Sequence, residues 1–593
     1  MSAKSIPLAL AALVTLALAA PARAGCTLGK LAELPVTMSH LRPIVQARLN
    51  GADAPFIAGS GAIFSSLSPA AATAYGLSLG PAPFGMTLIG MGGATSNVSV
   101  ATAKDFTFAD VTLHHVQFVV GDKGFGGDAV GLLGQNVLGF ADVEYDLADG
   151  VIRLMRPHDC GDADLAYWAQ AQPVSVIDIE TGDAITPHTK AVATVNGVKI
   201  RVQFDTGSPR SMLSLAAAAR AGIKPDDPGV VPGGYSSGVA QRSYLRTWIA
   251  PVASFKLGSE EIQHTRLRIG DMKLYGDTDM LIGADFFLSH RVYVSNRQRK
   301  LYFTYGGGSV FNLETAPATE TASAPDPASA AGAPADQPGD AEGFARRAAA
   351  FASRQDYAAA VADLTRAIAL APGEPKHLFQ RGQVEAASHQ RPLALADYDA
   401  ALKLKPDDVL VLAARADLRR AGKEDALARA DLEAADRAAA ADPDHRLAIA
   451  AVYERMQAYP EAIAQLDPWI AAHPHDDRLP TALNNRCWDK ALLGQDLDQA
   501  LADCNAALRL RQGDPTILDS RGLAHLRRGE LDKAIADYDA VLKLRPTSAW
   551  SLYGRGLARL RKGQTNDGQA DLQAATALRP HLPEEAKARG LTP

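Results

Sequence analysis

The first half of the chain alternates apolar and polar residues with a period of two. A clear example is KIRVQF at residues 199–204, in which every second side chain is apolar. This is the pattern of a β-strand that buries one face. Asn-Gly dipeptides at 50–51 and 196–197 punctuate the pattern and favour hairpin turns. The first half is therefore predicted to be all-β, with half-buried strands joined by hairpins.

This β-rich half contains an internal repeat. Residues 50–77 align without a gap onto residues 196–223 at an offset of 146. Further on, LLGQN at 132–136 aligns with LIGAD at 281–285 at an offset of 149. Two β domains of one type are therefore expected, over residues 25–160 and 173–305.

The second half changes to a helical pattern with a period of 34 residues. Segments such as GELDKAIADYDAVLKLRP at 529–546 have the helix-turn-helix pattern. The positions that recur with this period are Pro372 and Pro406, Pro546 and Pro580, and the small residues Ala360, Ala394 and Ala534. This half resembles the tetratricopeptide repeats. The resemblance implies an all-α solenoid of six or seven copies over 341–582, with a surface for a protein partner.

Residues 307–340 separate the two halves. They are rich in Ala, Pro, Ser and Thr and contain no Lys or Arg. Because such a composition buries little apolar surface, a flexible linker is expected here.

The N-terminus has the pattern of a secretory signal peptide over residues 1–24. Lys4 precedes an apolar stretch from about residue 6 to residue 20, and Ala22-Arg23-Ala24 precedes Gly25. The stretch is shorter than the roughly 20 residues of a membrane anchor. A lipoprotein signal is the alternative because Cys26 follows closely, but Arg23 stands where such signals have an aliphatic residue. A periplasmic or secreted protein is therefore expected.

Composition excludes several classes of function. Asp and Glu number 66 against 60 Lys and Arg, so the formal charge is −6 and gives no basic footprint for nucleic acid or anionic membranes. A content of 47% apolar and 21% charged residues is typical of a folded chain. No later segment is apolar enough to span a membrane, and no group of residues has chelating spacing. Neither a metal nor a cofactor is expected.

The stretch FDTGSPRSMLS at residues 204–214 carries the clearest chemical motif. Asp-Thr-Gly-Ser at 205–208 follows an extended apolar segment, and Leu-Ile-Gly follows at 281–283. This arrangement resembles one lobe of a retropepsin-like or pepsin-like aspartic protease. In that family two facing aspartates share one proton, so that one activates a water and the other donates to the scissile carbonyl. The resemblance implies that Asp205 is catalytic and that an extended polypeptide is the substrate.

Three neighbours of Asp205 are expected to support the catalytic loop. Gly207 frees the backbone for the tight turn from which the carboxylate projects. Thr206 is expected to bond across to the partner lobe, and Ser208 completes the motif. Tyr235, in the glycine-rich stretch that follows, is the candidate flap residue over the cleft.

The first domain lacks the matching carboxylate. At the positions that align with 205–208 it has Gly59, Ser60, Gly61 and then alanine. Two alternatives follow from this loss. The second domain could pair with that of another molecule, so that a homodimer supplies Asp205 twice. Alternatively the two domains pair within one chain, and the cleft is a catalytically silent peptide groove.

The four cysteines form two candidate disulfides. Cys26 and Cys160 bracket the first β domain, and export makes a bond between them plausible. Cys487 and Cys504 fall on positions that face each other between the paired helices of a tetratricopeptide repeat, so the resemblance implies a second bond.

The leading functional hypothesis is an exported aspartic endopeptidase whose repeats recruit a protein partner. The alternative is a non-catalytic scaffold that binds peptide in the protease-like groove. Gly59 motivates this alternative.

Overall fold

The computed structural model describes residues 25–592, with gaps at the residues named next. These are 84–87, 91–92, 96–97, 110, 122–123, 126–128, 171, 182–187, 237–244, 274–276, 312–337 and 441–442. The signal peptide predicted for 1–24 lies outside the described residues, as does most of the predicted linker. No helix in the described part is long and apolar enough to cross a membrane.

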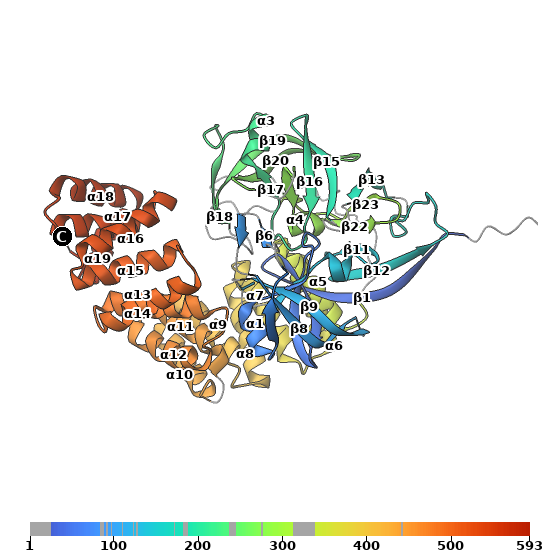
Figure 1. Cartoon of the computed structure of the whole chain (residues 1–593). Helices are drawn as coiled ribbons and strands as arrows, with labels where there is room; N and C mark the ends of the chain where they lie inside the picture. Colours follow the sequence, from blue (N-terminus) through green and yellow to red (C-terminus); the bar gives the residue numbers. More distant parts are fainter. Residues whose placement is uncertain are drawn as a thin grey trace, which may run out of the picture.

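The first half folds as two barrel-like β domains, as predicted (Figure 1). The first consists of β1 (Thr27–Ser39), β2 (Arg42–Leu49), β3 (Ala52–Ala58), β4 (Ser66–Leu67), β5 (Ser78–Pro81), β6 (Leu88–Gly90), β7 (Gly93–Thr95), β8 (Ser99–Phe108), β9 (Val111–Val120), β10 (Gly131–Leu133), β11 (Asp142–Asp146) and β12 (Val151–His158), with helices α1 (Pro69–Ala74) and α2 (Gln135–Leu138). The pairing of β2 with β8 closes the sheet on itself.

The second β domain repeats this architecture. It consists of β13 (Ser175–Asp178), β14 (Glu180–Thr181), β15 (Thr189–Val195), β16 (Val198–Phe204), β17 (Met212–Ser214), β18 (Val231–Ser236), β19 (Leu245–Leu257), β20 (Glu260–Gly270), β21 (Met280–Ile282), β22 (His290–Ser295) and β23 (Lys300–Tyr305), with helices α3 (Leu215–Arg220) and α4 (Ala284–Phe287). Here β15 pairs with β19, as β2 pairs with β8 in the first domain. Ser68 and Ser214, 146 residues apart, cap α1 and α3 through the same hydroxyl contact to the third backbone N–H that follows.

A continuous sheet joins the two domains. Strand β11 of the first domain pairs antiparallel with β22 of the second, with Glu144 opposite Tyr293. The order β13-β23-β22-β11-β12-β1 therefore interleaves strands that are far apart in the sequence. The two β domains of one chain are thus paired with each other.

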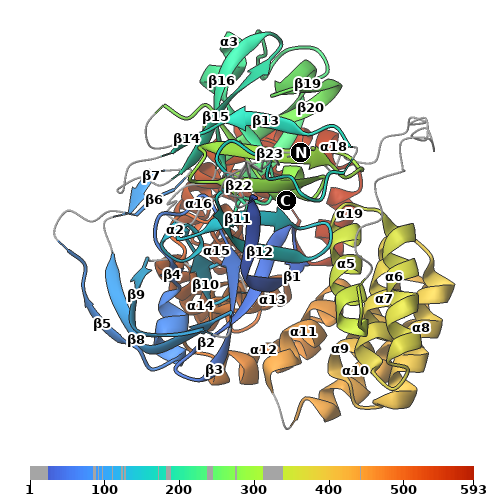
Figure 2. The same cartoon turned by 90° about the vertical axis from the view of Figure 1, so that its right-hand side faces the viewer.

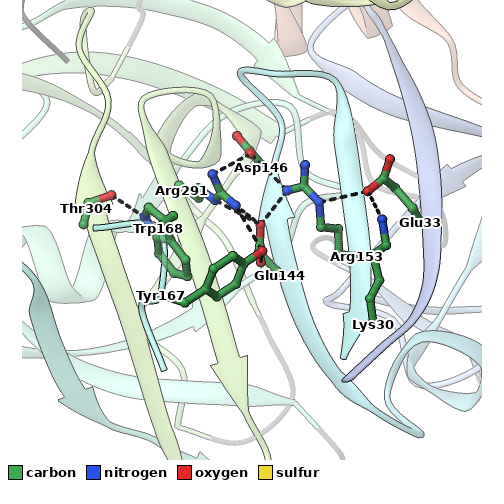
Figure 3. A network of polar contacts seen from close by, with 9 residues as sticks. All are labelled: Lys30, Glu33, Glu144, Asp146, Arg153, Tyr167, Trp168, Arg291 and Thr304. Atoms are coloured by element: carbon green, nitrogen blue, oxygen red, sulfur yellow. Dashed lines mark hydrogen bonds and ion pairs between the residues drawn. The ribbon is translucent and has the colours of Figure 1, made fainter. Parts of the chain in front are cut away.

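A buried ion network holds this shared sheet together (Figure 3). Glu144 is fully buried and accepts from Arg153 of the first domain and Arg291 of the second, each at 2.6 Å. Asp146 lies 3.2 and 3.3 Å from the same two guanidinium groups. The Tyr167 hydroxyl donates to Glu144 at 2.6 Å. Because a buried carboxylate requires such partners, the network fixes the two domains in one relative position.

The second β domain ends later than the sequence analysis placed it. Phe311 is buried, with its ring 5.1 Å from that of Phe255, and Val310 is buried beside it. The predicted linker, 307–340, therefore begins after residue 311. At its other end Asp340 caps the first helix of the array by accepting from the backbone N–H of Gly343.

The second half is an all-helical array, as predicted. Its helices are α5 (Ala341–Ser353), α6 (Tyr357–Leu370), α7 (Pro375–Ala387), α8 (Arg391–Leu404), α9 (Val409–Ala421), α10 (Asp425–Ala438), α11 (Arg446–Arg455), α12 (Tyr459–Ala472), α13 (Leu479–Leu493), α14 (Leu497–Leu510), α15 (Pro515–Arg528), α16 (Leu531–Leu544), α17 (Ala549–Arg561), α18 (Thr565–Leu578) and α19 (Leu582–Ala588). They form seven consecutive pairs and one final helix. The array bends around the β domains, with α5 beside them (Figures 1 and 2). Leu582 and Ala586 are fully buried, so the array continues past the predicted end at 582.

A ladder of largely buried ion pairs repeats along the array. In six of the seven helix pairs, an Arg of the first helix forms two hydrogen bonds with an Asp of the second helix. The pairs are Arg347–Asp363, Arg381–Asp397, Arg415–Asp431, Arg486–Asp503, Arg521–Asp537 and Arg555–Asp571. The fourth helix pair has Ile449 and Gln465 at the corresponding positions, and Arg446 bonds Gln465 instead. This is the region in which the 34-residue register slips.

The structure contains both cysteine pairs that the sequence analysis proposed. Cys26 is bonded to Cys160, and Cys487 is bonded to Cys504 between α13 and α14. The second bond is fully buried.

Removing the buried disulfide is expected to destabilise the array. It closes a short loop with a sequence separation of 17, for which chain-entropy arguments give about 3 kcal/mol. Cys487→Ala/Cys504→Ala should therefore lower the free energy of unfolding by about 2–4 kcal/mol in denaturant titrations followed by circular dichroism. The matched control, Cys26→Ala/Cys160→Ala, should leave the helical transition unchanged. Free thiols at 487 and 504 in the oxidised protein would contradict the assignment.

Candidate active site

The candidate site lies where two equivalent loops meet between the β domains. Strand β16 runs parallel to β21, so the loop that starts at Asp205 leaves the sheet beside Ile282. Strand β3 runs parallel to β10 in the same way, so the loop that starts at Gly59 leaves beside Leu133. The apolar-apolar-glycine strands β10 and β21 therefore support the two loops.

The two loops are joined by reciprocal hydrogen bonds. The backbone N–H of Ser60 donates to Thr206 Oγ1 at 3.0 Å, and the backbone N–H of Thr206 donates to Ser60 Oγ at 3.0 Å. The Thr206 hydroxyl donates to the carbonyl of Ala58 at 2.6 Å, and the Ser60 hydroxyl donates to that of Phe204 at 3.3 Å. Ser60 of the first domain thus has the same role as Thr206 of the second. Both side chains are buried.

Asp205 lies at the centre of this junction. Its Oδ1 accepts from the backbone N–H of Gly207 at 2.9 Å and from that of Gly61 at 3.1 Å. Burial raises the pKa of the carboxyl above its ordinary value, and these N–H donors, together with that of Ser208, oppose the shift. Gly61 has no room for a side chain, because a Cβ there would lie 2.2 Å from Asp205 Cγ.

The position opposite Asp205 holds no carboxylate. A Cβ at Gly59 would lie 2.8–2.9 Å from three side-chain atoms of Leu132. Leu132 belongs to a buried apolar cluster with Ile57 and Phe125. An aliphatic side chain therefore fills the space that a side chain at position 59 would need.

A second carboxylate, that of the buried Asp285, supports the Asp205 loop by binding Ser211. Asp285 accepts from the backbone N–H of Ser211 at 2.9 Å and from its hydroxyl at 2.7 Å. Burial raises the pKa of Asp285 to about 6, against these donors. The first domain has the neutral equivalent, in which Ser65 donates to Asn136 at 2.7 and 2.9 Å. Sequence reasoning missed this pair, although the alignment of LLGQN with LIGAD contained the signal.

The flap candidate Tyr235 lies on β18 and contacts the helical array. Its hydroxyl donates to the carbonyl of Leu544, and the Arg545 guanidinium lies 5.2 Å from the centre of its ring. Residues 237–244, which follow β18, lie outside the described part.

The described residues contain no group of three or more His, Cys, Asp or Glu side chains that could hold a metal ion.

The structure thus brings Asp205, Thr206 and Gly207 together with Ser60 and Gly61. Ser208 lies in the same loop, where its hydroxyl donates to the Arg210 carbonyl at 3.0 Å. The four cysteines lie elsewhere, in the clamps described above. The contacts of Leu132 and Tyr235 depend on elements distant in sequence, and the motif could not predict them.

Comparison with known families agrees with this division of the chain. Residues 45–137 and 191–286 each match the family described as aspartyl protease, and residues 522–563 match the family described as TPR repeat. No curated protein sequence matches the chain.

Solved structures similar to the chain include tetratricopeptide repeat proteins. One, from Parabacteroides merdae, has 18% sequence identity and a TM-score of 0.33, and the match covers 42% of this chain and 99% of that one. Another, YrrB, is described as a TPR protein with an unusual peptide-binding site. It has 18% identity, a TM-score of 0.24, and coverage of 38% and 97%. Yeast Tom70 has 17% identity, a TM-score of 0.30, and coverage of 38% and 48%.

The paired loops, the two family matches and the helical array lead to one assignment. The chain combines two tandem domains of the aspartyl protease type with a C-terminal array of tetratricopeptide repeats.

Proposed function

We propose that this protein is an exported peptide-binding protein, which holds an extended polypeptide in its protease-like cleft without cleaving it. The helical array serves a protein partner. One observation carries the proposal: among the described residues, the junction of the two domains has a single carboxylate, Asp205, opposite Gly59 and Leu132.

Aspartic protease chemistry needs two carboxyl groups at this junction. One must take a proton from the attacking water while the other donates a proton to the scissile carbonyl. Asp205 is able to fill one of these roles at a time. Gly59 has no side chain, and Leu132 offers only apolar atoms, so neither can fill the other role.

A silent cleft of this fold retains the means to bind peptide. An extended peptide forms backbone hydrogen bonds with an exposed strand, and pockets select its side chains. Burial raises the pKa of Asp205, which favours the neutral carboxyl, and only the neutral carboxyl can donate a hydrogen bond to a peptide carbonyl. The aliphatic Leu132 makes the opposite side of the junction apolar.

An endopeptidase is the second candidate. A specific observation favours it: the described structure gives Asp205 backbone donors but no cationic partner, and a buried carboxylate without one is costly. Such a group is typical of a functional site. A homodimeric site is a less suitable route to activity, because Ser60 and Gly61 of the same chain already occupy the face of the Asp205 loop.

Export to the periplasm or the exterior forms part of the proposal. The two disulfides support it, since such bonds persist in oxidising compartments.

The proposed function predicts binding without cleavage. The fluorescence anisotropy of labelled peptides from a random library should rise when the protein is added between pH 4 and 7. Mass spectrometry of the same peptides should detect no new termini. Asp205→Ala should weaken binding about three- to tenfold, as expected for the loss of one hydrogen bond of about 0.5–1.5 kcal/mol.

Asp53→Ala, at an exposed position of the first domain, is the matched control and should bind as the wild type does. Cleavage that Asp205→Ala abolishes and Asp53→Ala retains would replace this proposal with the endopeptidase. If the wild type neither binds nor cleaves the peptides, both candidate functions are overturned.

A further inference from the structure

Beyond α5, which packs against β1, the helical array contacts the β domains at two further places in the described structure, one in each domain. Both contacts come from connections between successive helix pairs. One is the connection between α12 and α13, which carries Asp477, and the other is the connection between α16 and α17, which begins at Arg545.

The first contact is made to the domain that carries Gly59. The Asp477 carboxylate accepts from the Ser68 hydroxyl and from the backbone N–H of Phe125, while burial raises its pKa. The fit is close, because a Cβ on Gly124 would lie 2.2 Å from Asp477 Cγ. Ser68 follows β4, and Phe125 packs in the same apolar cluster as Leu132. This contact therefore lies next to the residues that pack against the Gly59 loop.

The second contact is made to the domain that carries Asp205. The Tyr235 hydroxyl donates to the Leu544 carbonyl, and Arg545 lies over the Tyr235 ring at 5.2 Å. Both partners in the array are at the C-terminal end of α16, where backbone carbonyls have no partner within the helix. A tyrosine hydroxyl and an aromatic face are well suited to this carbonyl and cation.

The edge of the array between the two contacts is internally braced. Arg511, which ends α14, donates to the Asp477 carbonyl at 3.2 Å and to the Thr481 hydroxyl at 3.0 Å. Arg545, which ends α16 one repeat later, donates to the Thr516 hydroxyl at 3.4 Å. A rigid edge that contacts both domains is able to fix a strand of one relative to the other.

We infer that Arg545 and Leu544 are positioning residues of the cleft, which hold strand β18 in place through Tyr235. The array thereby sets how readily a peptide enters beside Asp205. The effect on peptide entry rests on the proposed function, whereas the restraint that the array places on β18 is independent of it. Release of Tyr235 from the array is the step that frees the strand.

Amide hydrogen exchange of the full chain without peptide tests the restraint itself. Tyr235→Ala removes the hydroxyl and the ring without altering the array, and it should speed exchange across residues 231–236 about tenfold. Arg545→Ala should act in the same direction. The double variant should exchange about as fast as Tyr235→Ala, because both substitutions break one contact.

Lys405→Ala is the matched control. Lys405 ends α8 as Arg545 ends α16, and its ion pair is with Asp408. Exchange at 231–236 should stay at the wild-type rate in this variant. Unchanged exchange in Tyr235→Ala, or additive effects in the double variant, would overturn the inference. Unchanged helicity in far-ultraviolet circular dichroism distinguishes release of the strand from loss of the fold.

Peptide association then separates this inference from the proposed function. Stopped-flow measurements should give faster association with Tyr235→Ala than with the wild type. Faster exchange with equal association rates would overturn the control of entry. Faster exchange with no peptide binding by any variant would retain the restraint and overturn the proposed function.

Discussion

Replacing Arg347 with alanine is expected to destabilise the array by about 3–5 kcal/mol. Arg347 donates to both carboxylate oxygens of Asp363 at 2.7 and 2.8 Å, and both side chains are about nine-tenths buried. Arg347→Ala leaves the Asp363 carboxylate in the interior without its cation. Guanidinium titration followed by circular dichroism at 222 nm measures the change.

Two further variants make this prediction specific. Arg347→Met/Asp363→Leu removes both charges and should recover most of the lost stability, because apolar residues can replace a buried pair at little cost. Lys376→Ala breaks the exposed pair of Lys376 with Glu342, in which both side chains are about half exposed, and should cost less than about 1 kcal/mol. Equal losses from Arg347→Ala and Lys376→Ala would contradict the importance of burial.

Replacing Asp489 with asparagine is expected to stabilise the array at pH 8 and to have little effect near pH 4. Asp489 is fully buried on α13, and its two carboxylate oxygens have no hydrogen-bond partner in the described structure. Burial, with a contribution from the nearby Glu454, raises its pKa to about 8. The folded protein therefore holds this proton over a pH range in which the unfolded chain releases it.

The sign of the pH dependence follows from this difference. Because the folded-state pKa is the higher one, the contribution of Asp489 to stability is greatest below about pH 4 and falls by up to about 1.4 kcal/mol per pH unit as the pH rises towards 8. Asp489→Asn removes the titrating group, so its melting temperature should exceed that of the wild type by an amount that grows with pH. Asp407→Asn, on an exposed turn, is the control. A difference that does not change between pH 5 and pH 8 would contradict the prediction.

Residue identity and spacing alone revealed glycine and a short hydroxyl side chain in both motif loops. In the structure Gly61 has no room for a Cβ beside the Asp205 side chain, and the hydroxyls of Thr206 and Ser60 form the reciprocal bonds between the two domains. Duplication at a fixed offset predicted which residues of the two loops are equivalent, but it left open whether the loops face each other within one chain. By contrast, the alignment contained Asp285 and Asn136 without showing that they accept from Ser211 and Ser65, because those contacts depend on how the loops fold back.

Boundaries were less predictable than elements. The composition of 307–340 predicted a linker, yet Phe311 packs on Phe255, because burying its ring against the adjacent core removes a large apolar surface from water. The helical array likewise extends through α19, whose sequence lies outside the 34-residue pattern.

By itself, the sequence determined the two repeat types, the cysteine pairs, the Asp-Thr-Gly-Ser loop and the absence of a carboxylate at position 59. These are properties of residue identity and spacing, which periodicity and alignment reveal directly. Only the tertiary structure decided that the two β domains pair within one chain, that Leu132 fills the space beside Gly59, and that Tyr235 meets Arg545. These contacts join residues far apart in the sequence, and the packing of whole domains determines them.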